Sequence, residues 1–239
     1  MTPQEQDQHS NLQRSHSLHS RRQRVRVQQF GVSLDGIGAG EDQTLERPFG
    51  RGRFGDIDPG ELFRWAGATA SWTLRTEPGG SRGLEDYLLR DYSHGIGAEI
   101  MGRNKFGPVR GPWPDEDWTG WWGDEPPFRC PVFVLTHHPR PSFTLADTTF
   151  HFLDATPQEA LQQALTAADG KDVRIGGGVS TVRHFLDADL IDEMHVAIAP
   201  LEFGSGLKLW DAPEDLTDRF HLEKIPAPSG ATHCFFWRR

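Results

Sequence analysis

The stretch Val173-Arg-Ile-Gly-Gly-Gly-Val-Ser-Thr181 carries most of the information about the fold. A short β-rich run leads into three glycines, Gly176-Gly-Gly178, and apolar residues then recur at helical spacing. A strand that ends in glycines and opens a helix leaves backbone N–H groups free at the helix N-terminus, where the helix dipole favours an anion. Ser180 and Thr181 add hydroxyl donors. The stretch predicts a phosphate-binding turn, and a tight βα turn without a ligand is the alternative.

Strands and helices alternate on both sides of this turn. Apolar or β-rich runs predict strands over residues 25–34, 97–102, 131–136, 149–153, 173–175 and 194–199. Helical spacing predicts helices over residues 84–92, 157–168 and 179–186. The runs 220–224 and 231–237 flank Pro226-Ala-Pro-Ser-Gly230 and predict an antiparallel hairpin. We therefore expect an α/β fold with a mostly parallel central sheet flanked by helices and a C-terminal antiparallel hairpin.

The helix after residue 156 has the clearest start in the chain. Thr156 is placed as N-cap, Pro157 as the first helical residue, and Glu159 closes a capping box. Gly170 is placed just beyond the end of this helix.

Two segments lack such periodicity. Residues 41–80 are Gly-rich and charged, with a short helical patch near Trp65. Pro108–Pro127 places four tryptophans among prolines, glycines and acids, namely Trp113, Trp118, Trp121 and Trp122. Tryptophan is costly to leave exposed, so this segment is either a core cluster or a wall over a ring-shaped ligand. We expect a pocket wall or a dimer contact.

Composition narrows the class of protein. The 239 residues have a formal net charge of −9, which argues against a nucleic-acid partner. Cys130 and Cys234 form no Cys-x-x-Cys motif, which fits a reducing, cytoplasmic setting better than a disulfide scaffold. No apolar run has the length of a membrane span, so no membrane partner is expected. Residues 1–24 are too polar to bury a core and are predicted as a disordered tail before a domain at 25–239.

Polar residues follow two of the predicted strands. Arg103 follows the strand that ends near Gly102, and Thr136 and His137 follow the next one. Ligands of open α/β sheets lie beyond the carboxyl ends of the strands, so these side chains are expected at one crevice. A solvated loop is the alternative for His137 and His138, and no third residue is spaced to make a metal site with them.

A set of short motifs then resembles a known superfamily when taken in order. They are Leu34-Asp-Gly36, Ile100-Met-Gly-Arg-Asn104, Val134-Leu-Thr136, Ile175-Gly-Gly-Gly178, Leu190-Ile-Asp-Glu-Met-His-Val-Ala-Ile-Ala-Pro200 and Gly204-Ser-Gly206. The chain resembles the dihydrofolate-reductase-like superfamily, most closely the reductase domain of riboflavin biosynthesis and its stand-alone relatives. The resemblance covers about Val25 to Trp237.

The resemblance implies an NADPH-dependent oxidoreductase that acts on a C=N or C=O bond of a small heterocyclic substrate, in a homodimer. It also implies the site residues. The residues expected to bind the cofactor are Ser33, Asp35, Gly36, Gly102, Arg103, Asn104, Thr136, His137, Gly176, Gly177, Gly178, Ser180 and Thr181. Counting back from Gly102 implies Asp86 as the catalytic proton donor, with a solvated helix acid as the alternative. No metal is implied.

Two positions differ from the riboflavin-pathway domain. Gln29 stands where a lysine is usual, and Ile175 stands where an acid tends to precede the glycines. These two residues remove charged groups that the ribosylamino-pyrimidinone phosphate of riboflavin synthesis would meet, and Pro108–Pro127 has no counterpart in dihydrofolate reductase, so we expect neither that phosphate nor dihydrofolate to be turned over efficiently. That riboflavin-pathway reductase activity is one alternative, and a non-catalytic cofactor-binding or interaction protein on the same scaffold is the other.

Overall fold

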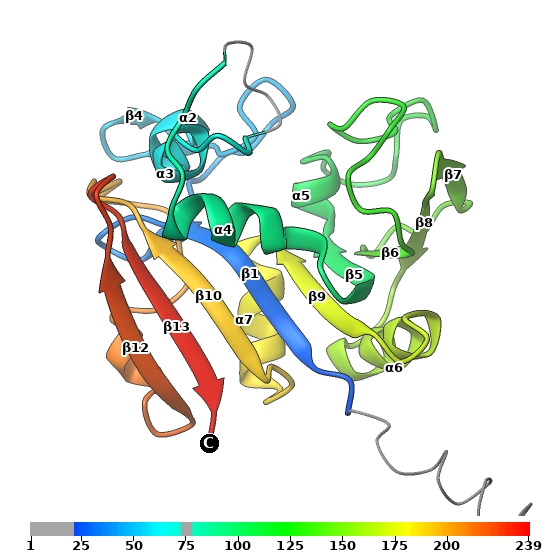
Figure 1. Cartoon of the computed structure of the whole chain (residues 1–239). Coiled ribbons are helices and arrows are strands. Elements are labelled where there is room, and N and C mark those ends of the chain that lie inside the picture. The colour runs from blue at the N-terminus through cyan, green and yellow to red at the C-terminus, as the bar shows by residue number, and fades with distance from the viewer. Residues whose placement is uncertain (1–21, 73–77) are drawn as a thin grey trace, which may run out of the picture.

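The computed structural model describes residues 22–72 and 78–239. Within them, a nine-stranded sheet spans the molecule (Figure 1). Its strands, in sheet order, are β12 (Phe220–Pro226), β13 (Thr232–Arg238), β10 (Glu193–Ile198), β1 (Val25–Val32), β9 (Asp172–Gly177), β5 (Ile96–Gly102), β6 (Val132–Leu135), β8 (Thr148–Leu153) and β7 (Phe143–Leu145). Strands β10 to β8 pair in parallel, whereas β12/β13, β13/β10 and β8/β7 are antiparallel. The predicted fold class is confirmed, and the C-terminal hairpin is antiparallel as expected.

The other elements lie on the faces and at the ends of this sheet. They are α2 (Pro59–Leu62), α3 (Arg64–Gly67), α4 (Leu84–Arg90), η1 (Asp91–Ser93), α5 (Arg103–Phe106), α6 (Pro157–Ala167), α7 (Val179–Asp187), η2 (Pro213–Leu216), the pair β2 (Ile37–Ala39) and β11 (Leu207–Lys208), and the pair β3 (Arg51–Gly52) and β4 (Gly55–Asp56). Figure 1 shows α4 in front of the sheet and α7 behind it. The small pairs and β7 have no periodic signal in the sequence, because strands of two or three residues are too short to show one.

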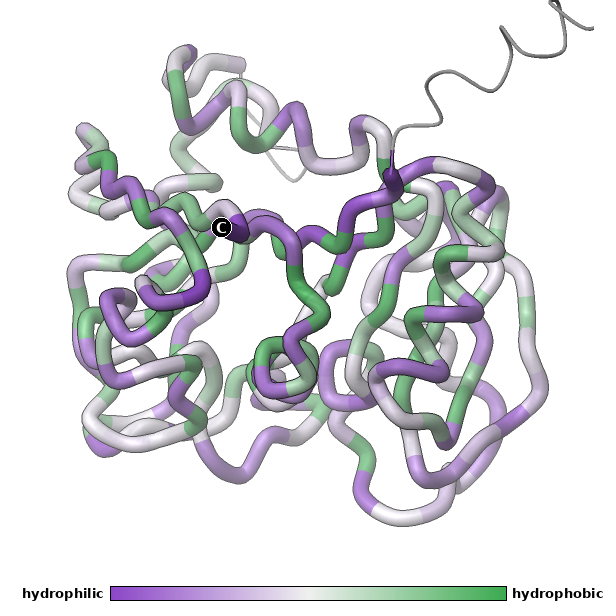
Figure 2. The backbone as a smooth tube through the Cα atoms, turned by 90° about the horizontal axis from the view of Figure 1, so that it is seen from below, coloured by the Kyte–Doolittle hydropathy of each residue, from purple (hydrophilic) through white to green (hydrophobic). Residues whose placement is uncertain are grey.

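Two of the hydrophobic clusters pack against the faces of the sheet. On the side of α6 and α7, Ala164 and Phe185 pack with Ile100, Val173 and Ile175. Over the opposite half, Phe106 of α5 packs with residues of β6 and β8. Full burial of one such side chain stabilises the fold by roughly 1.5–3 kcal/mol. Among the described helices none is long and apolar enough to cross a membrane, and Figure 2 shows hydrophobic and hydrophilic residues alternating along the chain.

The start of α6 confirms the sequence prediction. The Thr156 hydroxyl accepts from the Glu159 backbone N–H, and the Glu159 carboxylate accepts from the Thr156 backbone N–H at 2.9 Å. Such a capping box satisfies two N–H groups that the helix itself leaves unpaired. The helix ends at Ala167, with Ala168 as its C-cap, and the predicted terminal glycine Gly170 follows two residues later with φ +80°.

Helix α4 forms where predicted, and its apolar residues are unequally buried. Leu84 and Tyr87 are 40 % and 57 % exposed, whereas Leu88 and Leu89 are half-buried against the cluster that contains Trp65. Glu85 and Asp86 are buried, because each carboxylate accepts hydrogen bonds from neighbouring segments. Hydrophobic spacing therefore located the helix, while long-range polar contacts decided its rotation.

The predicted tail falls mainly outside the described residues, which begin at Arg22. The last residues of the predicted tail are already part of the domain. The Gln23 side chain donates to the carbonyl oxygens of Leu165 and Lys171, and the Arg24 backbone N–H donates to Asp172 at 2.9 Å.

Candidate cofactor site

The glycine turn joins β9 directly to α7. Gly178 is the N-cap of α7, and its lack of a side chain leaves the first N–H groups of the helix without a side-chain cap. A Cβ built on Gly178 would have no atom of the described structure within 4 Å, so open space lies in front of the turn. Gly177 has φ +110°, a conformation that side chains disfavour. An anion can therefore approach the start of α7 closely.

The segment after β5 meets this turn. A Cβ on Gly102 would lie 2.3 Å from Oγ1 of Thr181 and 3.8 Å from the backbone nitrogen of Gly178. Only glycine at residue 102 allows such an approach. The structure thus brings together two segments that the sequence separates by over seventy residues. Ser180 is exposed on α7, whereas Thr181 is buried against Gly102.

Arg103 lies at the start of α5 with its guanidinium over the Trp113 ring, 3.8 Å from Cζ to the ring centroid. Nη1 donates to Thr136 Oγ1 over a long 3.4 Å. Nε and Nη2 are buried without a hydrogen-bond partner among the described residues. Burial, and then the nearby Arg140, lower the pKa of Arg103 from its ordinary value. Because a buried unpaired guanidinium is unfavourable, the arrangement favours an anion as its partner.

The residues expected beside Arg103 divide into two groups. Thr136 is buried and contacts Arg103 as expected. The Asn104 amide instead donates to Gln43 at 2.9 Å, which ties α5 to the first irregular segment. His137 points away, with 91 % of its side chain exposed and Nδ1 3.0 Å from Asp154. The contacts of His137 therefore do not connect it to the Arg103 group.

The polar side chains in the turn after β1 form hydrogen bonds within the protein. The Ser33 hydroxyl donates to the Asp35 carboxylate, which also accepts from the backbone N–H groups of Phe203 and Gly204. These bonds lower the pKa of Asp35 despite partial burial. Gly36 has φ +77°, and a Cβ there would lie 2.4 Å from the Trp210 carbonyl oxygen. Ser33, Asp35 and Gly36 thus shape the end of β1, and their role toward a cofactor stays a prediction.

A buried ion network lies beside the glycine turn, and the sequence analysis missed it. Glu99 of β5 is fully buried and pairs with Arg174 of β9, which is also buried. Lys105 of α5 donates to Glu99 at 3.1 Å and to the Gly176 carbonyl oxygen at 2.7 Å. A Cβ on Gly176 would lie 2.0 Å from a Glu99 carboxylate oxygen, so this glycine makes room for the network.

The network joins two basic side chains, Arg174 and Lys105, to one carboxylate next to the turn. Burial lowers the pKa of Lys105, and the charge of Glu99 opposes this shift. Burial opposes the ionisation of Glu99, but Arg174 and Lys105 together hold its pKa below the ordinary value. A signal for it was present in the sequence. Glu99 and Arg174 are charged residues inside otherwise apolar strand runs, and such residues need a buried partner.

Comparison with known proteins shows the family of the chain. Residues 25–229 match the RibD C-terminal domain family. The chain belongs to that family. Its members have a dihydrofolate-reductase-like reductase fold, so the resemblance seen in the sequence is confirmed. No curated protein sequence matches the chain.

Solved structures share the fold of this RibD C-terminal domain at low sequence identity. One is described as a riboflavin biosynthesis protein from Shewanella sp. PV-4, with 21 % identity, a TM-score of 0.51, and coverage of 90 % of this chain and 97 % of that chain. A pyrimidine reductase-like protein from Corynebacterium diphtheriae has 15 % identity, a TM-score of 0.50 and coverage of 91 % and 92 %.

A third similar structure is larger. It is the diaminohydroxyphosphoribosylaminopyrimidine deaminase/5-amino-6-(5-phosphoribosylamino)uracil reductase of Thermotoga maritima, with 13 % identity and a TM-score of 0.51. The match covers 91 % of this chain but 57 % of that protein. The RibD C-terminal domain described here thus spans little more than half of the bifunctional protein.

In this RibD C-terminal domain, tryptophans of Pro108–Pro127 pack against a hydrophobic core, and the expected pocket wall or dimer contact stays a prediction. Trp113, Trp118 and Trp122 pack against the core that contains Phe106. The indole nitrogens of Trp113 and Trp118 donate to the carbonyl oxygens of His138 and Phe106, whereas Trp121 remains 39 % exposed. The segment covers Arg103 and strands β6 and β8, so its tryptophans lie beside the expected phosphate-binding arginine.

Asp86, the expected proton donor, makes no hydrogen bond or ion pair with Arg103 or with the glycine turn among the described residues. Asp86 is 1 % exposed, accepts from the Ser71 backbone N–H at 2.8 Å and lies 3.4 Å from Nε of Arg90. Hydrogen bonds from Ser71, followed by the charges of Arg90 and Arg82, lower the pKa of Asp86. A lowered pKa favours the ionised form, which holds no proton to donate. The catalytic role of Asp86 stays a prediction, and these contacts count against it. The residues that the structure describes contain no cluster of His, Cys, Asp or Glu suited to a metal.

Proposed function

We propose that this RibD C-terminal domain is an NADPH-dependent reductase of a small heterocyclic substrate. The observation that carries the proposal is Arg103, whose guanidinium has two buried nitrogens without a partner among the described residues. It directly follows Gly102, which lies against Thr181 and the Gly178 backbone nitrogen. A cofactor with both a pyrophosphate and a 2′-phosphate would place anions at the glycine turn and at Arg103.

Different residues would bind the two phosphate groups of the cofactor. Gly178 leaves the start of α7 open to the pyrophosphate, Gly177 supplies the turn with φ +110°, and Gly176 makes room for Lys105, which adds a cation beside them. Arg103 and Thr136 would hold the 2′-phosphate that distinguishes NADPH from NADH. When bound, the cofactor supplies a hydride for a C=N or C=O bond, and the protein orients the two rings.

The substrate is proposed at the level of its class alone. Gln29, at the usual lysine position, donates its side-chain amide to the Leu88 carbonyl oxygen of α4. This side chain is therefore engaged within the fold and is no cation for a substrate phosphate. We accordingly propose a heterocycle other than the phosphorylated riboflavin intermediate and other than dihydrofolate. A homodimer is also proposed, to be measured by light scattering after gel filtration.

Two measurements test the function. Calorimetric titration should show NADPH binding more tightly than NADH, and equal affinities would overturn the cofactor assignment. NADPH absorbance should then be followed with dihydrofolate, the ribosylamino-pyrimidinone phosphate and a panel of heterocyclic ketones and imines. Turnover of a panel member supports the proposal, whereas efficient turnover of either standard substrate contradicts the substrate class. NADPH binding with no turnover across the panel would favour the non-catalytic alternative.

A further inference from the structure

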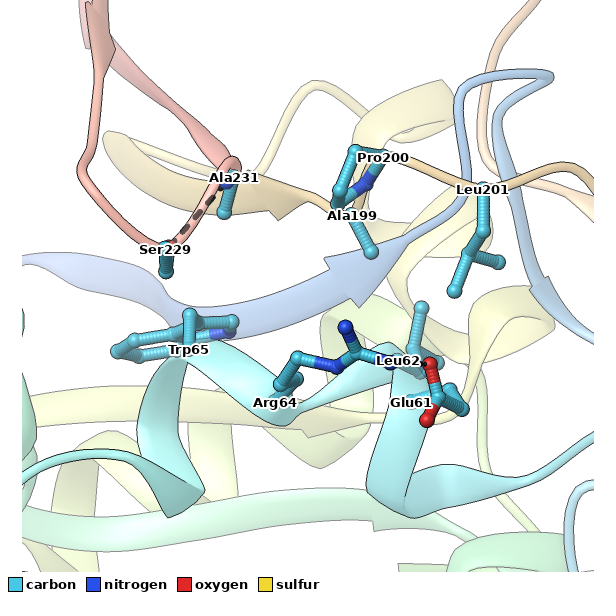
Figure 3. A pocket seen from close by; sticks show the side chains of 9 residues that line it. All are labelled: Glu61, Leu62, Arg64, Trp65, Ala199, Pro200, Leu201, Ser229 and Ala231. Carbon is cyan, nitrogen blue, oxygen red and sulfur yellow. Dashed lines mark hydrogen bonds and ion pairs between the residues drawn. The ribbon is translucent and has the colours of Figure 1, made fainter.

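A small pocket lies at the carboxyl ends of β1 and β10, next to helices α2 and α3. Its volume is about 120 Å³, well above the roughly 10–15 Å³ that one water needs on the same measure. One wall is formed by residues 199–201, which come directly after β10. The Ala199 N–H donates to the Val32 carbonyl oxygen and the Leu34 N–H donates to the Leu201 carbonyl oxygen, both at 2.8 Å. Ligands of α/β sheets bind at this end of the strands. Figure 3 shows the side chains that surround the pocket.

Trp65 gives the pocket a hydrogen-bond donor. The residue is 2 % exposed, and its Nε1 has no hydrogen-bond partner among the described residues. Figure 3 shows this nitrogen at the end of the ring that faces the pocket. The ring is held edge-on by His195 and His233, at centroid distances of 6.0 and 5.1 Å. A buried N–H without an acceptor is unfavourable, so an acceptor in the pocket would stabilise it.

The remaining polar groups of the pocket already have partners. At its exposed mouth, Arg64 forms an ion pair with Glu61, so the two charges offset each other. The Ser229 hydroxyl donates to Glu85 and accepts from the Ala231 backbone N–H at 3.2 Å. The walls between are apolar and include Leu62, Ala199 and Leu201. Glu61 already offsets the charge of Arg64, so a carboxylate would find no net positive charge at the mouth, whereas a neutral carbonyl oxygen needs only the indole N–H.

We propose that this pocket is a subsite for a neutral ring carbonyl, of the lactam type, which accepts a hydrogen bond from Nε1 of Trp65. The statement that this carbonyl belongs to the substrate rests on the proposed function. The statement that the pocket binds a lactam is independent of it, because such binding requires no cofactor.

The test follows the indole N–H signals of the ¹⁵N-labelled full chain by NMR, with 2-pyrrolidinone as the probe. The chain has eight tryptophans, and Trp65→Phe assigns the signal of Trp65 by its absence. We expect 2-pyrrolidinone to shift this signal saturably. Pyrrolidine, which has the same ring but no carbonyl, should leave it in place, as should acetate at the same concentration.

Variants test whether the shift arises in the pocket. Leu201→Phe and Ala199→Val both fill the pocket while keeping Trp65, and either one, when folded, should abolish the shift. Trp237→Phe removes an exposed tryptophan on β13 and should leave the Trp65 shift unchanged. The proposal is overturned if 2-pyrrolidinone leaves the signal unmoved, if acetate shifts it equally, or if the shift survives in a folded pocket-filling variant.

Calorimetry separates this proposal from the proposed function. Trp65→Phe should bind NADPH as the unaltered chain does, because the pocket and the glycine turn share no residue. Absence of NADPH binding together with a saturable lactam shift would contradict the proposed function and support the pocket. NADPH binding without a lactam shift would contradict the pocket alone.

Discussion

Nε2 of His195 lies 2.9 Å from Nδ1 of His233, and the contacts at both ends of this pair assign the protons. Nδ1 of His195 accepts from the Gln29 backbone N–H at 3.3 Å, so Nε2 must carry the proton and donate it to His233. Nε2 of His233 then donates to Glu85 at 3.2 Å. The hydrogen bonds thus run in one direction, from the Gln29 N–H through His195 and His233 to Glu85. This order requires both imidazoles to be neutral, because each of them accepts at Nδ1.

This relationship predicts that acid destabilises the protein. Burial, with His233 adding to it, lowers the pKa of His195 to about 3, and burial lowers the pKa of His233 as well. Unfolded histidine has a pKa of about 6.5, so the unfolded chain takes up more protons as the pH falls between 6.5 and 3. The full contribution to stability is present above pH 6.5. Between pH 7 and pH 5, His195 alone should cost about 2 kcal/mol of unfolding free energy.

Urea denaturation at several pH values measures this loss. His195→Phe removes one titrating group and should flatten the dependence between pH 7 and pH 5. His221→Asn, which removes an exposed histidine of β12, is the matched control. An equally steep dependence in His195→Phe would show that other groups cause it.

Replacement of Arg103 should weaken NADPH binding selectively. Arg103→Ala removes the cation with two unpaired buried nitrogens, and a lost charge-assisted hydrogen bond costs about 1.5–3 kcal/mol, or roughly 10- to 150-fold in affinity. Calorimetry should show no comparable change for NADH. Arg110→Ala, on the exposed part of the tryptophan segment, controls for the loss of one positive charge. Equal losses for both cofactors would remove Arg103 from the 2′-phosphate site.

Gly178→Ala tests the phosphate turn with little disturbance of the fold. Gly178 has φ −72°, which alanine tolerates, and the added methyl group would meet no atom within 4 Å. The methyl group would instead fill the approach to the start of α7, so NADPH affinity should fall by about tenfold or more. Gly177→Val is less informative, because φ +110° strains any side chain there. Unchanged NADPH affinity in Gly178→Ala, with an unchanged melting temperature, would refute the assignment.

Lys105 and Glu99 should separate binding from stability. Lys105→Met removes a cation beside Gly176 but leaves Glu99 paired with Arg174, so we expect a folded protein with about tenfold weaker NADPH binding. Glu99→Leu leaves Arg174 unpaired in the interior and should cost about 3–5 kcal/mol of unfolding free energy. Denaturation and calorimetry on both variants check the contrast. A large stability loss in Lys105→Met would make its role structural instead.

Asp86→Asn decides between the two roles of the buried helix acid. Asparagine keeps an oxygen that can accept from the Ser71 N–H, so only the charge and the titration are lost. From the lowered pKa we expect reductase activity with a panel substrate, and its pH profile, to stay within a few-fold of the unaltered chain. A loss of about 100-fold or more, typical of a missing general acid, would restore Asp86 as proton donor.

The order of strands and helices could be predicted from the sequence, and the sheet that contains them was predicted correctly. Periodicity and caps are local, so the capping box at Thr156 and the turn at Gly176-Gly-Gly178 were visible within a few residues. The motif order also identified the fold superfamily. For the candidate site, Gly102, Arg103, Thr136, Thr181 and the three glycines converge as expected, whereas His137 and Asp86 point elsewhere.

Tertiary structure alone decided which side chains are buried and what they contact. Hydrophobic spacing predicted helix α4 but not that Glu85 is buried, which follows from its contacts with His233 and Ser229, more than 140 residues away. The tryptophans of Pro108–Pro127 likewise became core because α5, β6 and β8 present an uncovered apolar face. The sequence by itself determined the local elements and the glycine turn, since their energetics depend on neighbouring residues. Contacts between distant segments determined the charge network and the Trp65 pocket, since β5 meets β9, and α3 meets the end of β10, only in the completed fold.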